Sequence, residues 1–275
     1  MIIDCHCHAG EGDGLTDPWD TRAPLKDFLR WSEETGIART VLFPAFHTDY
    51  LLANRAVARL VAADPRRFFG FAFIHPERDR GRVRALVQEA VEEHGFVGLK
   101  VHRHDARITR ETCEVARSYR LPVLYDVMGE VSVCELLATE YPDIAFIIPH
   151  LGSFADDWRA QLAFLDHLAR HPNIFTDTSG VRRFDLLRQA VARAGAGKIL
   201  FGSDGPWLHP AVELEKVRVL NLRSEEQAMV LGGNFLRLIR HVRTSPVGHT
   251  KIKARAAQAD GEFRDPWATP MVQIV

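Results

Sequence analysis

The sequence predicts a single (β/α)₈ barrel, of the TIM-barrel class of α/β folds, with an extended C-terminal tail. Eight short apolar runs alternate with segments of helical periodicity, and no hairpin signal separates the runs. This alternation is typical of parallel strands that are covered by helices. The length of 275 residues fits one domain of this kind. No glycine-rich phosphate loop follows the first run, which disfavours an open dinucleotide-binding sheet.

The expected strands are short apolar runs that are rich in residues favouring β-structure. Their spacing along the chain fits successive βα units. The runs cover residues 2–8, 40–45, 69–75, 97–102, 122–127, 145–150, 174–177 and 199–203.

The segments between these runs have the apolar periodicity of helices. In the third segment, apolar residues stand at i, i+3, i+4, i+7 and i+8 from Val83. Pro24 stands near the start of the first helix, where proline is favoured. In the last layer, Ser224 and Gln227 form a capping-box pattern that predicts a helix start at Ser224. The expected helices cover 25–31, 51–61, 83–91, 109–119, 131–141, 158–169, 184–194, 210–220 and 235–239.

The C-terminal residues 244–275 differ in composition from the rest of the chain. They combine a Ser-Pro-Val-Gly stretch, a charged run and an Asp-Pro-Trp stretch. Such a segment is expected to be extended, either disordered or lying on a neighbour. No domain boundary is predicted within residues 1–243.

The composition indicates a soluble globular protein. Hydrophobic residues make up 46% and charged residues 26% of the chain, and the net charge is −1. With no basic stripe or polybasic run, neither nucleic acid nor an anionic membrane surface is an expected partner. No signal peptide or membrane span is predicted. Four cysteines are too few for a disulfide framework, so a reducing cytoplasm is the expected compartment.

Two histidines near the end of the first run are the first candidate metal ligands. Because strand side chains alternate, His6 and His8 are expected on one face, with Cys5 and Cys7 turned to the other as small buried hydrophobes. Neutral imidazoles are strong ligands for Zn²⁺ and similar ions. The His-x-His pattern alone is weak, since two histidines two positions apart often occur by chance.

Four further polar residues end other runs, where barrel enzymes place catalytic groups. They are Lys100, Asp126, His150 and Asp204. A lysine or aspartate at the end of a hydrophobic strand is costly to bury unless it has a partner or a modification. The convergence of several such groups on one rim favours a functional site over separate structural roles.

With these residues, the chain resembles the amidohydrolase superfamily, and in particular the amidohydrolase-related branch that includes aminocarboxymuconate-semialdehyde decarboxylase and resorcylate decarboxylases. The resemblance spans residues 1–243 and keeps the order of the motifs. The matching stretches are Ile3-Asp4-Cys5-His6-Cys7-His8, Gly98-Leu99-Lys100-Val101-His102, Pro149-His150-Leu151-Gly152, Asp177-Thr178-Ser179-Gly180, Leu200-Phe201-Gly202-Ser203-Asp204 and Leu231-Gly232-Gly233-Asn234.

The resemblance implies a role for each matching residue. His6 and His8 match metal ligands, and Asp204 matches an aspartate that binds the metal and takes the proton of the attacking water. His150 matches a second ligand or a catalytic acid–base, depending on the subtype. Lys100 stands where two-metal members carry a carboxylated bridging lysine. The implied cofactor is one divalent ion, zinc or alternatively manganese, with no organic cofactor. Members of this branch are often dimers, so the resemblance also implies a homodimer.

Asp126 marks a departure from the family, whose members usually carry a histidine at this position. An aspartate can ligate Zn²⁺ or Mn²⁺ through oxygen, which would give a ligand set of two histidines and two aspartates. The competing interpretation is an ion pair between Asp126 and Lys100 with no tightly held metal, as in the pyrone-dicarboxylate lactonase type. We favour the metal.

Four other residues are candidates for substrate binding: His75, His102, Arg103 and Trp207. An arginine fork suits a carboxylate. The alternatives are a hydrogen-bonded rim histidine, a solvated arginine and a tryptophan that only packs. Asp177 is interpreted as either a barrel-bottom residue or a group that supports the ligands.

The primary functional hypothesis is a hydrolase that acts on a small lactone, amide or ring carboxylate. A bound divalent ion would lower the pKa of its water from 15.7 to about 7. Asp204 would take the water proton, and His150 would stabilise the oxyanion or protonate the leaving group. The first alternative is non-oxidative decarboxylation of a small aromatic or unsaturated acid. The second is a metal-independent lactonase or a non-catalytic binding protein on the same fold.

Overall fold

The predicted barrel is present in the computed structural model, which describes residues 1–13, 21–154 and 157–243. The described residues form a nine-stranded sheet in the order β2-β1-β3-β4-β5-β6-β7-β8-β9, in which only the β1–β2 pair is antiparallel. The segment 244–275, expected to be an extended tail, lies outside the described residues. The strands are β1 (Ile2–Glu11), β2 (Arg22–Ala23), β3 (Ile37–Pro44), β4 (Phe68–Phe73), β5 (Gly98–His102), β6 (Val123–Asp126), β7 (Phe146–Ile148), β8 (Ile174–Asp177) and β9 (Ile199–Leu200).

The barrel closes where the segment after β9 meets β1. The backbone N–H of Asp204 donates to the carbonyl of His6 at 2.8 Å, and that of His8 donates to the carbonyl of Gly205 at 2.7 Å. A parallel bridge between Cys7 and Gly205 lies in the same stretch. Closure therefore brings Asp204, from the end of the barrel sequence, beside the two histidines from its beginning.

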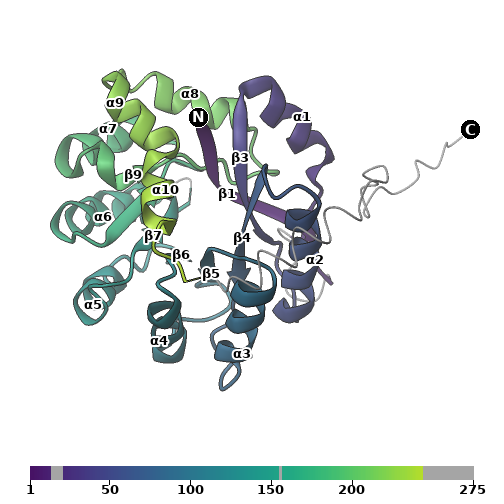
Figure 1. Cartoon of the computed structure of the whole chain (residues 1–275). Coiled ribbons are helices and arrows are strands. Elements are labelled where there is room, and N and C mark those ends of the chain that lie inside the picture. Colours follow the sequence, from purple (N-terminus) through teal and green to yellow (C-terminus); the bar gives the residue numbers. More distant parts are fainter. Residues whose placement is uncertain (14–20, 155–156, 244–275) are drawn as a thin grey trace, which may run out of the picture.

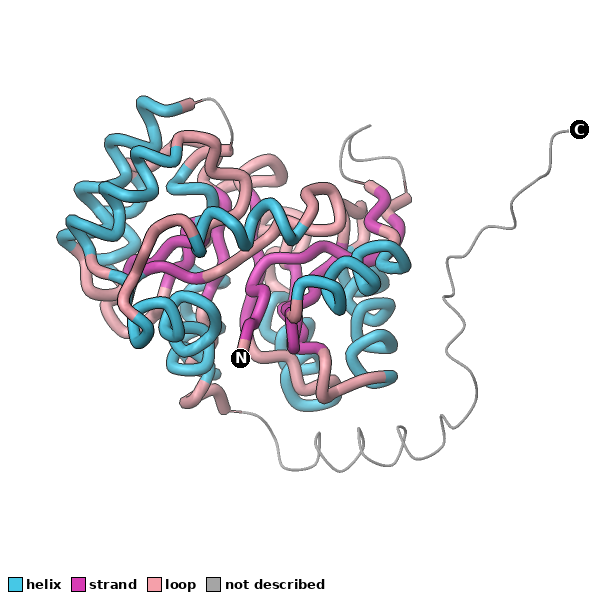
Figure 2. Tube along the Cα trace, turned by 90° about the horizontal axis from the view of Figure 1, so that it is seen from above, coloured by secondary structure: helices cyan, strands magenta, loops and turns pink. Residues whose placement is uncertain are grey.

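Helices cover the outer face of the strands, as Figures 1 and 2 show. None of the helices within the described ranges has the length and apolarity needed to cross a membrane. The third helix continues as a π-helical turn over Glu89–Glu93, and another π turn over Met229–Gly233 precedes the last helix. The α-helices are α1 (Leu25–Thr35), α2 (Tyr50–Ala63), α3 (Val83–Gln88), α4 (Arg110–Tyr119), α5 (Val133–Glu140), α6 (Trp158–Arg170), α7 (Phe184–Ala194), α8 (Pro210–Arg218), α9 (Ser224–Ala228) and α10 (Asn234–Ile239).

Helix α9 begins at Ser224 as predicted, but its capping residues differ from the prediction. Ser224 is the first residue inside α9, and the capping position belongs to Arg223. The carboxylate of Glu226 accepts from the backbone N–H of Arg223 at 3.2 Å and from its guanidinium at 2.9 Å. The helix start is therefore fixed by an acidic residue three positions after an arginine, so the predicted Ser224–Gln227 capping box is wrong by one position.

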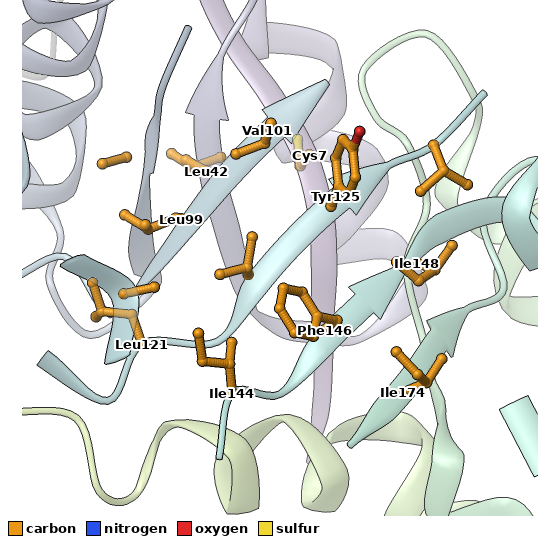
Figure 3. Packing of buried hydrophobic residues seen from close by; sticks show 14 of the residues in the cluster. Cys7, Leu42, Leu99, Val101, Leu121, Tyr125, Ile144, Phe146, Ile148 and Ile174 are labelled. Atoms are coloured by element: carbon orange, nitrogen blue, oxygen red, sulfur yellow. The ribbon is translucent and has the colours of Figure 1, made fainter. Parts of the chain in front are cut away.

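The larger part of the core lies between the strands and the helices. Apolar residues of successive strands, such as Leu99, Val101 and Phe146, are fully buried in this layer. Figure 3 shows them in rows along the sheet together with Cys7, Tyr125 and Ile148. Their alternate neighbours along each strand point into the barrel, where the polar site residues lie.

A second, smaller core fills the inside of the barrel below the site. It contains Val41, Phe71, Leu124 and Ile147, and Phe235 of α10 packs into it. The rings of Phe71 and Phe235 lie 6.1 Å apart, and Figure 1 shows α10 crossing the strands at this end. The barrel interior is therefore packed at one end, which leaves space for a cavity only at the other.

Gly98 provides a test of this inner packing. A Cβ atom at Gly98 would lie 2.3 Å from atoms of the fully buried Phe71 ring. Overpacking of a core costs roughly 1–3 kcal/mol, so Gly98→Ala is expected to lower the free energy of unfolding by that amount. Denaturant titration would measure it. Gly197→Ala is the control, because its Cβ would meet no atom closer than 3.4 Å, and equal losses in both variants would contradict the packing argument.

Candidate metal centre and active-site cavity

A cavity of about 460 Å³ opens at the carboxyl ends of the strands. Its size suits one small molecule. The polar lining residues come from β1, β5, β6 and the segments that follow β7 and β9, and they are His6, His8, Lys100, His102, Asp126, His150, Ser153 and Asp204. The apolar walls are Phe46, Met128, Phe154, Trp207 and Leu208.

A β-bulge in β1 aims both histidines into this cavity. Asp4 pairs with Thr40 of β3 while Cys7 pairs with Leu42, so β1 spans three residues where β3 spans two. Cys5 consequently packs in the inner core, whereas Cys7 packs in the outer layer. The prediction that strand alternation turns both cysteines away from the histidines is therefore wrong for Cys5, although both thiols are buried as expected.

Three of the predicted residues meet in one cluster. Oδ1 of Asp204 lies 3.3 Å from Nε2 of His6 and 3.7 Å from Nε2 of His8. One ligand atom from each of these residues lies within 4.8 Å of the other two. In a tetrahedral zinc site with bonds of about 2.0 Å, ligand atoms stand about 3.3 Å apart. The spacing of the cluster fits a divalent ion.

The hydrogen bonds behind the two rings support this fit. Nδ1 of His8 lies 2.9 Å from the carbonyl oxygen of Pro44, which can only accept, so Nδ1 carries the proton. Nδ1 of His6 lies 2.8 Å from the carboxylate of Asp177, and the same argument applies. Burial lowers the pKa of both His6 and His8, which favours the neutral rings. Each Nε2 therefore turns a lone pair toward an anionic oxygen, an arrangement that a cation between them would stabilise.

Asp177 is the supporting group, one of the two roles considered from the sequence. Although burial acts to raise the pKa of Asp177, its contacts with His6 hold that pKa well below the usual range. Asp177 also accepts from the hydroxyl of Ser179 at 2.6 Å. The carboxylate thus orients His6 without facing the ion site itself.

Asp177→Asn is expected to weaken metal affinity by about 10- to 100-fold, because the amide no longer fixes the tautomer of His6. Competition with a metal-sensitive dye would measure the dissociation constant. Asp185→Asn, which changes an exposed carboxylate, is the matched control. An Asp177→Asn affinity equal to that of the control would mean that Asp177 does not support the ligand.

Asp126 lies with two other histidines. Its Oδ2 is 3.3 Å from Nε2 of His102 and 3.5 Å from Nε2 of His150, and the group formed by His6, His8 and Asp204 does not include it. Although burial acts to raise the pKa of Asp126, the nearby His102 and His150 hold it well below its usual range. The structure therefore places Asp126 beside His150.

Lys100 is buried and its side chain borders the cavity. Among the described residues, no carboxylate forms an ion pair with its Nζ, so the pair with Asp126 considered from the sequence is not seen. The ammonium lies 5.0 Å from the centre of the Phe43 ring. Burial lowers the pKa of Lys100, while Asp126 and Asp204 act against that shift. An unpaired cation facing a cavity favours an anionic ligand.

The remaining substrate-binding candidates divide into two pairs. His102 and Trp207 line the cavity, and the Trp207 ring lies 4.4 Å from that of His8. Arg103 and His75 are not among the lining residues. The guanidinium of Arg103 bonds Glu130 at 2.9 Å, and Nδ1 of His75 accepts from two backbone N–H groups of its own turn. Local partners thus hold these two side chains away from the site.

The sequence interpretation missed some residues of the site. Ser179 Oγ lies 3.0 Å from Nδ1 of His150, and Phe46 and Phe154 wall the cavity. The signal for Ser179 was present, because it belongs to the Asp177-Thr178-Ser179-Gly180 motif. The two phenylalanines follow strands as ordinary apolar residues, and no sequence pattern distinguishes them from core residues.

Three residues that line the cavity have unusual backbone conformations: His150, Asp204 and Met128, whose φ is 48°. His150 and Asp204 have φ values of 59° and 58°, in the left-handed region that residues other than glycine rarely adopt. Leu151, next to His150, has φ 54°. Such conformations cluster at functional sites, where the surrounding structure holds them.

Comparison with known proteins identifies the family and the fold. A sequence model of the amidohydrolase family matches residues 3–240. No protein among the curated sequences matches the chain. The barrel of 5-carboxyvanillate decarboxylase from Sphingomonas paucimobilis superposes with a TM-score of 0.69 at 14% identity, over 88% of this chain and 99% of that one.

Two further solved structures have the same fold. Dihydroxybenzoic acid decarboxylase from Polaromonas sp. JS666, with bound manganese and the inhibitor 2-nitroresorcinol, gives a TM-score of 0.66 at 18% identity and covers 87% of this chain and 96% of that one. A probable 2-pyrone-4,6-dicarboxylic acid hydrolase from Acinetobacter baumannii, with bound citric acid, gives 0.65 at 18% identity and covers 87% and 99%. The resemblance drawn from the motifs is confirmed, and the chain belongs to the amidohydrolase family of enzymes.

Proposed function

We propose that the protein is a metal-dependent hydrolase that acts on a small lactone or amide bearing a carboxylate, or on a carboxylated ring. The main support is the arrangement at Asp204, where two imidazoles with fixed tautomers turn their lone pairs toward one carboxylate oxygen. His6, His8 and Asp204 would hold one divalent ion, zinc or manganese. When bound, such an ion supplies Lewis-acid polarisation and makes water acidic enough to ionise at neutral pH.

The acid–base roles in this proposal fall to Asp204 and His150. Asp204 borders the cavity and would take a proton from the attacking water. Nδ1 of His150 lies 2.7 Å from the carbonyl oxygen of Ser179, so Nε2 is the atom that exchanges a proton with the substrate. Asp126, 3.5 Å from that Nε2, would stabilise the protonated ring while His150 donates to the leaving group.

The substrate class follows from the charges and walls of the cavity. With neutral histidines, Lys100, Asp126 and Asp204 give the lining a formal charge of −1, and a divalent ion would reverse it to +1. Lys100 would then bind a carboxylate of the substrate. Phe46, Phe154 and Trp207 offer flat apolar surfaces for a ring and exclude water from the reacting groups.

Non-oxidative decarboxylation of an aromatic acid is the second candidate. The three aromatic walls favour a planar ring, and His150 is placed to exchange a proton. In that reaction the acid would protonate the ring carbon as the bond to the carboxylate breaks and CO₂ leaves. The same residues would serve both reactions, so only an analysis of the products can distinguish hydrolysis from decarboxylation.

The test is turnover by protein loaded separately with Zn²⁺ and Mn²⁺. Paired lactones and amides with and without a carboxylate would be followed by acid release, and hydroxybenzoates by CO₂ release. Hydrolysis of the carboxylated member of a pair supports the proposal. CO₂ release without hydrolysis would replace it with the decarboxylase. Binding without any turnover would favour a binding protein.

A reducing, cytoplasmic compartment is part of the proposal. Its support is that Cys5, Cys7, Cys113 and Cys134 are all free and buried. Recovery of the native protein with a disulfide between any two of them would contradict it.

A further inference from the structure

We propose a second divalent-metal site on the outer face of the barrel, formed by Glu135 of α5 with His167 and His171 at the end of α6. The two helices are neighbours in the outer ring (Figure 1), and the three residues come from segments that the cavity does not use. His167 and His171 are four residues apart, so both rings lie on the same side of the helix end. The ion would be zinc or a similar transition metal, which prefers imidazole and carboxylate ligands.

The geometry of the cluster matches that of the site inside the barrel. Oε2 of Glu135 lies 3.0 Å from Nε2 of His171 and 3.6 Å from Nδ1 of His167. One ligand atom from each residue lies within 4.8 Å of the other two. These distances lie on either side of the spacing of about 3.3 Å between ligands of tetrahedral zinc. The rings stack with centroids 6.0 Å apart and an interplanar angle of 15°.

His167 provides an independent reason to expect a ligand. Its Nδ1 is buried and has no hydrogen-bond partner among the described residues, although a carboxylate oxygen stands nearby. A buried polar atom without a partner is costly. An ion between Nδ1 and Oε2 would satisfy both atoms. Glu135 is about half exposed, so the site stays open to solvent for entry of the ion and for a water as fourth ligand.

Arg170 competes for the same oxygen. Its guanidinium donates to Oε2 of Glu135 at 3.1 Å. The arginine side chain is 61% exposed and can turn into solvent. An exposed pair of this kind contributes little, so a metal that binds Glu135 would displace Arg170 at small cost. Removal of Arg170 should therefore strengthen metal binding, whereas a purely structural cluster would show no such gain.

The experiment is equilibrium dialysis of the full chain, without an affinity tag, against ZnCl₂, followed by metal analysis. Wild type is expected to bind one equivalent more than His171→Ala. His6→Ala should lose the cavity ion and keep the outer one, so the result does not depend on the proposed function. Arg170→Ala should bind the outer ion up to about fivefold more tightly.

His94→Ala is the matched control. His94 is also largely buried and lies 3.4 Å from Glu89. Within the part of the chain that the structure describes, its Nε2 has no hydrogen-bond partner and no second histidine lies beside it. Its zinc stoichiometry should equal that of wild type. Glu135→Gln, which changes an exposed side chain, provides a second variant if His171→Ala does not fold. Wild-type stoichiometry in both Glu135→Gln and His171→Ala would overturn the proposal, as would an unchanged affinity in Arg170→Ala.

Discussion

His6→Ala is expected to abolish turnover and binding of the cavity ion while leaving the barrel folded. Loss of a direct ligand should exceed the roughly 10- to 100-fold cost of losing a supporting group. The fold should survive because Asp177, left without the imidazole, still accepts from the hydroxyl and the backbone N–H of Ser179 and from the backbone N–H of His150. We therefore expect a stability loss of about 1–3 kcal/mol, typical of one lost buried hydrogen bond.

The measurement combines metal analysis, steady-state kinetics and thermal unfolding on one preparation. Asp204→Asn is expected to show the same loss of turnover, because the amide neither carries the charge nor accepts the proton. His241→Ala removes an exposed histidine and is the control for histidine content. Full activity in His6→Ala or Asp204→Asn, with a normal melting curve, would rule out the proposed mechanism.

Lys100→Met is expected to lower kcat/KM for a carboxylated substrate by roughly 30- to 5,000-fold. Truncation of one partner of a buried charge pair costs about 2–5 kcal/mol, and here the other partner would be the substrate. In the free protein no ion-pair partner of the ammonium is found within the described ranges, and burial lowers its pKa, so the folded state disfavours its charged form. The methionine variant should therefore be as stable as wild type or more stable.

Lys198→Met should show the reverse pattern. The ammonium of Lys198 donates to the carbonyl oxygens of His171 and Ile174, at the end of the barrel opposite to the cavity. Its loss should lower stability by about 1–3 kcal/mol and leave kcat/KM unchanged. Substrate analogues without the carboxylate would react equally with wild type and Lys100→Met. A loss of stability in Lys100→Met with an unchanged kcat/KM would assign the lysine a structural role.

The barrel was predictable because both sides of each strand are buried, one against the helices and one inside the barrel. Each strand is therefore a continuous apolar run, which can be recognised in the sequence without knowledge of its neighbours. The carboxyl ends of the strands were predictable to within about three residues, because a polar residue such as Asp204 follows an apolar run near the rim. The helices followed from their periodicity. The start of α9 at Ser224 was also predicted, but its cap was not, because Arg223 and Glu226 form the capping contacts expected of Ser224 and Gln227.

The site was less predictable, because its details depend on pairings between strands. A bulge shifts the register of β1 against β3, and nothing in the order His6-Cys7-His8 distinguishes a bulged strand from a regular one. The position of Asp126 depends on His102 and His150, which come from two neighbouring segments. The cluster on α5 and α6 was invisible for the same reason, since the contact between Glu135 and His171 joins residues 36 positions apart.

The left-handed backbone at His150 and Asp204 lowers the stability of the fold at two positions where the side chains are needed for activity. For residues other than glycine, this conformation costs roughly 1–2 kcal/mol at each position. Glycine would adopt it without that cost but would bring no imidazole or carboxylate. Glycine at these two positions would therefore increase stability, but the resulting variants would be inactive.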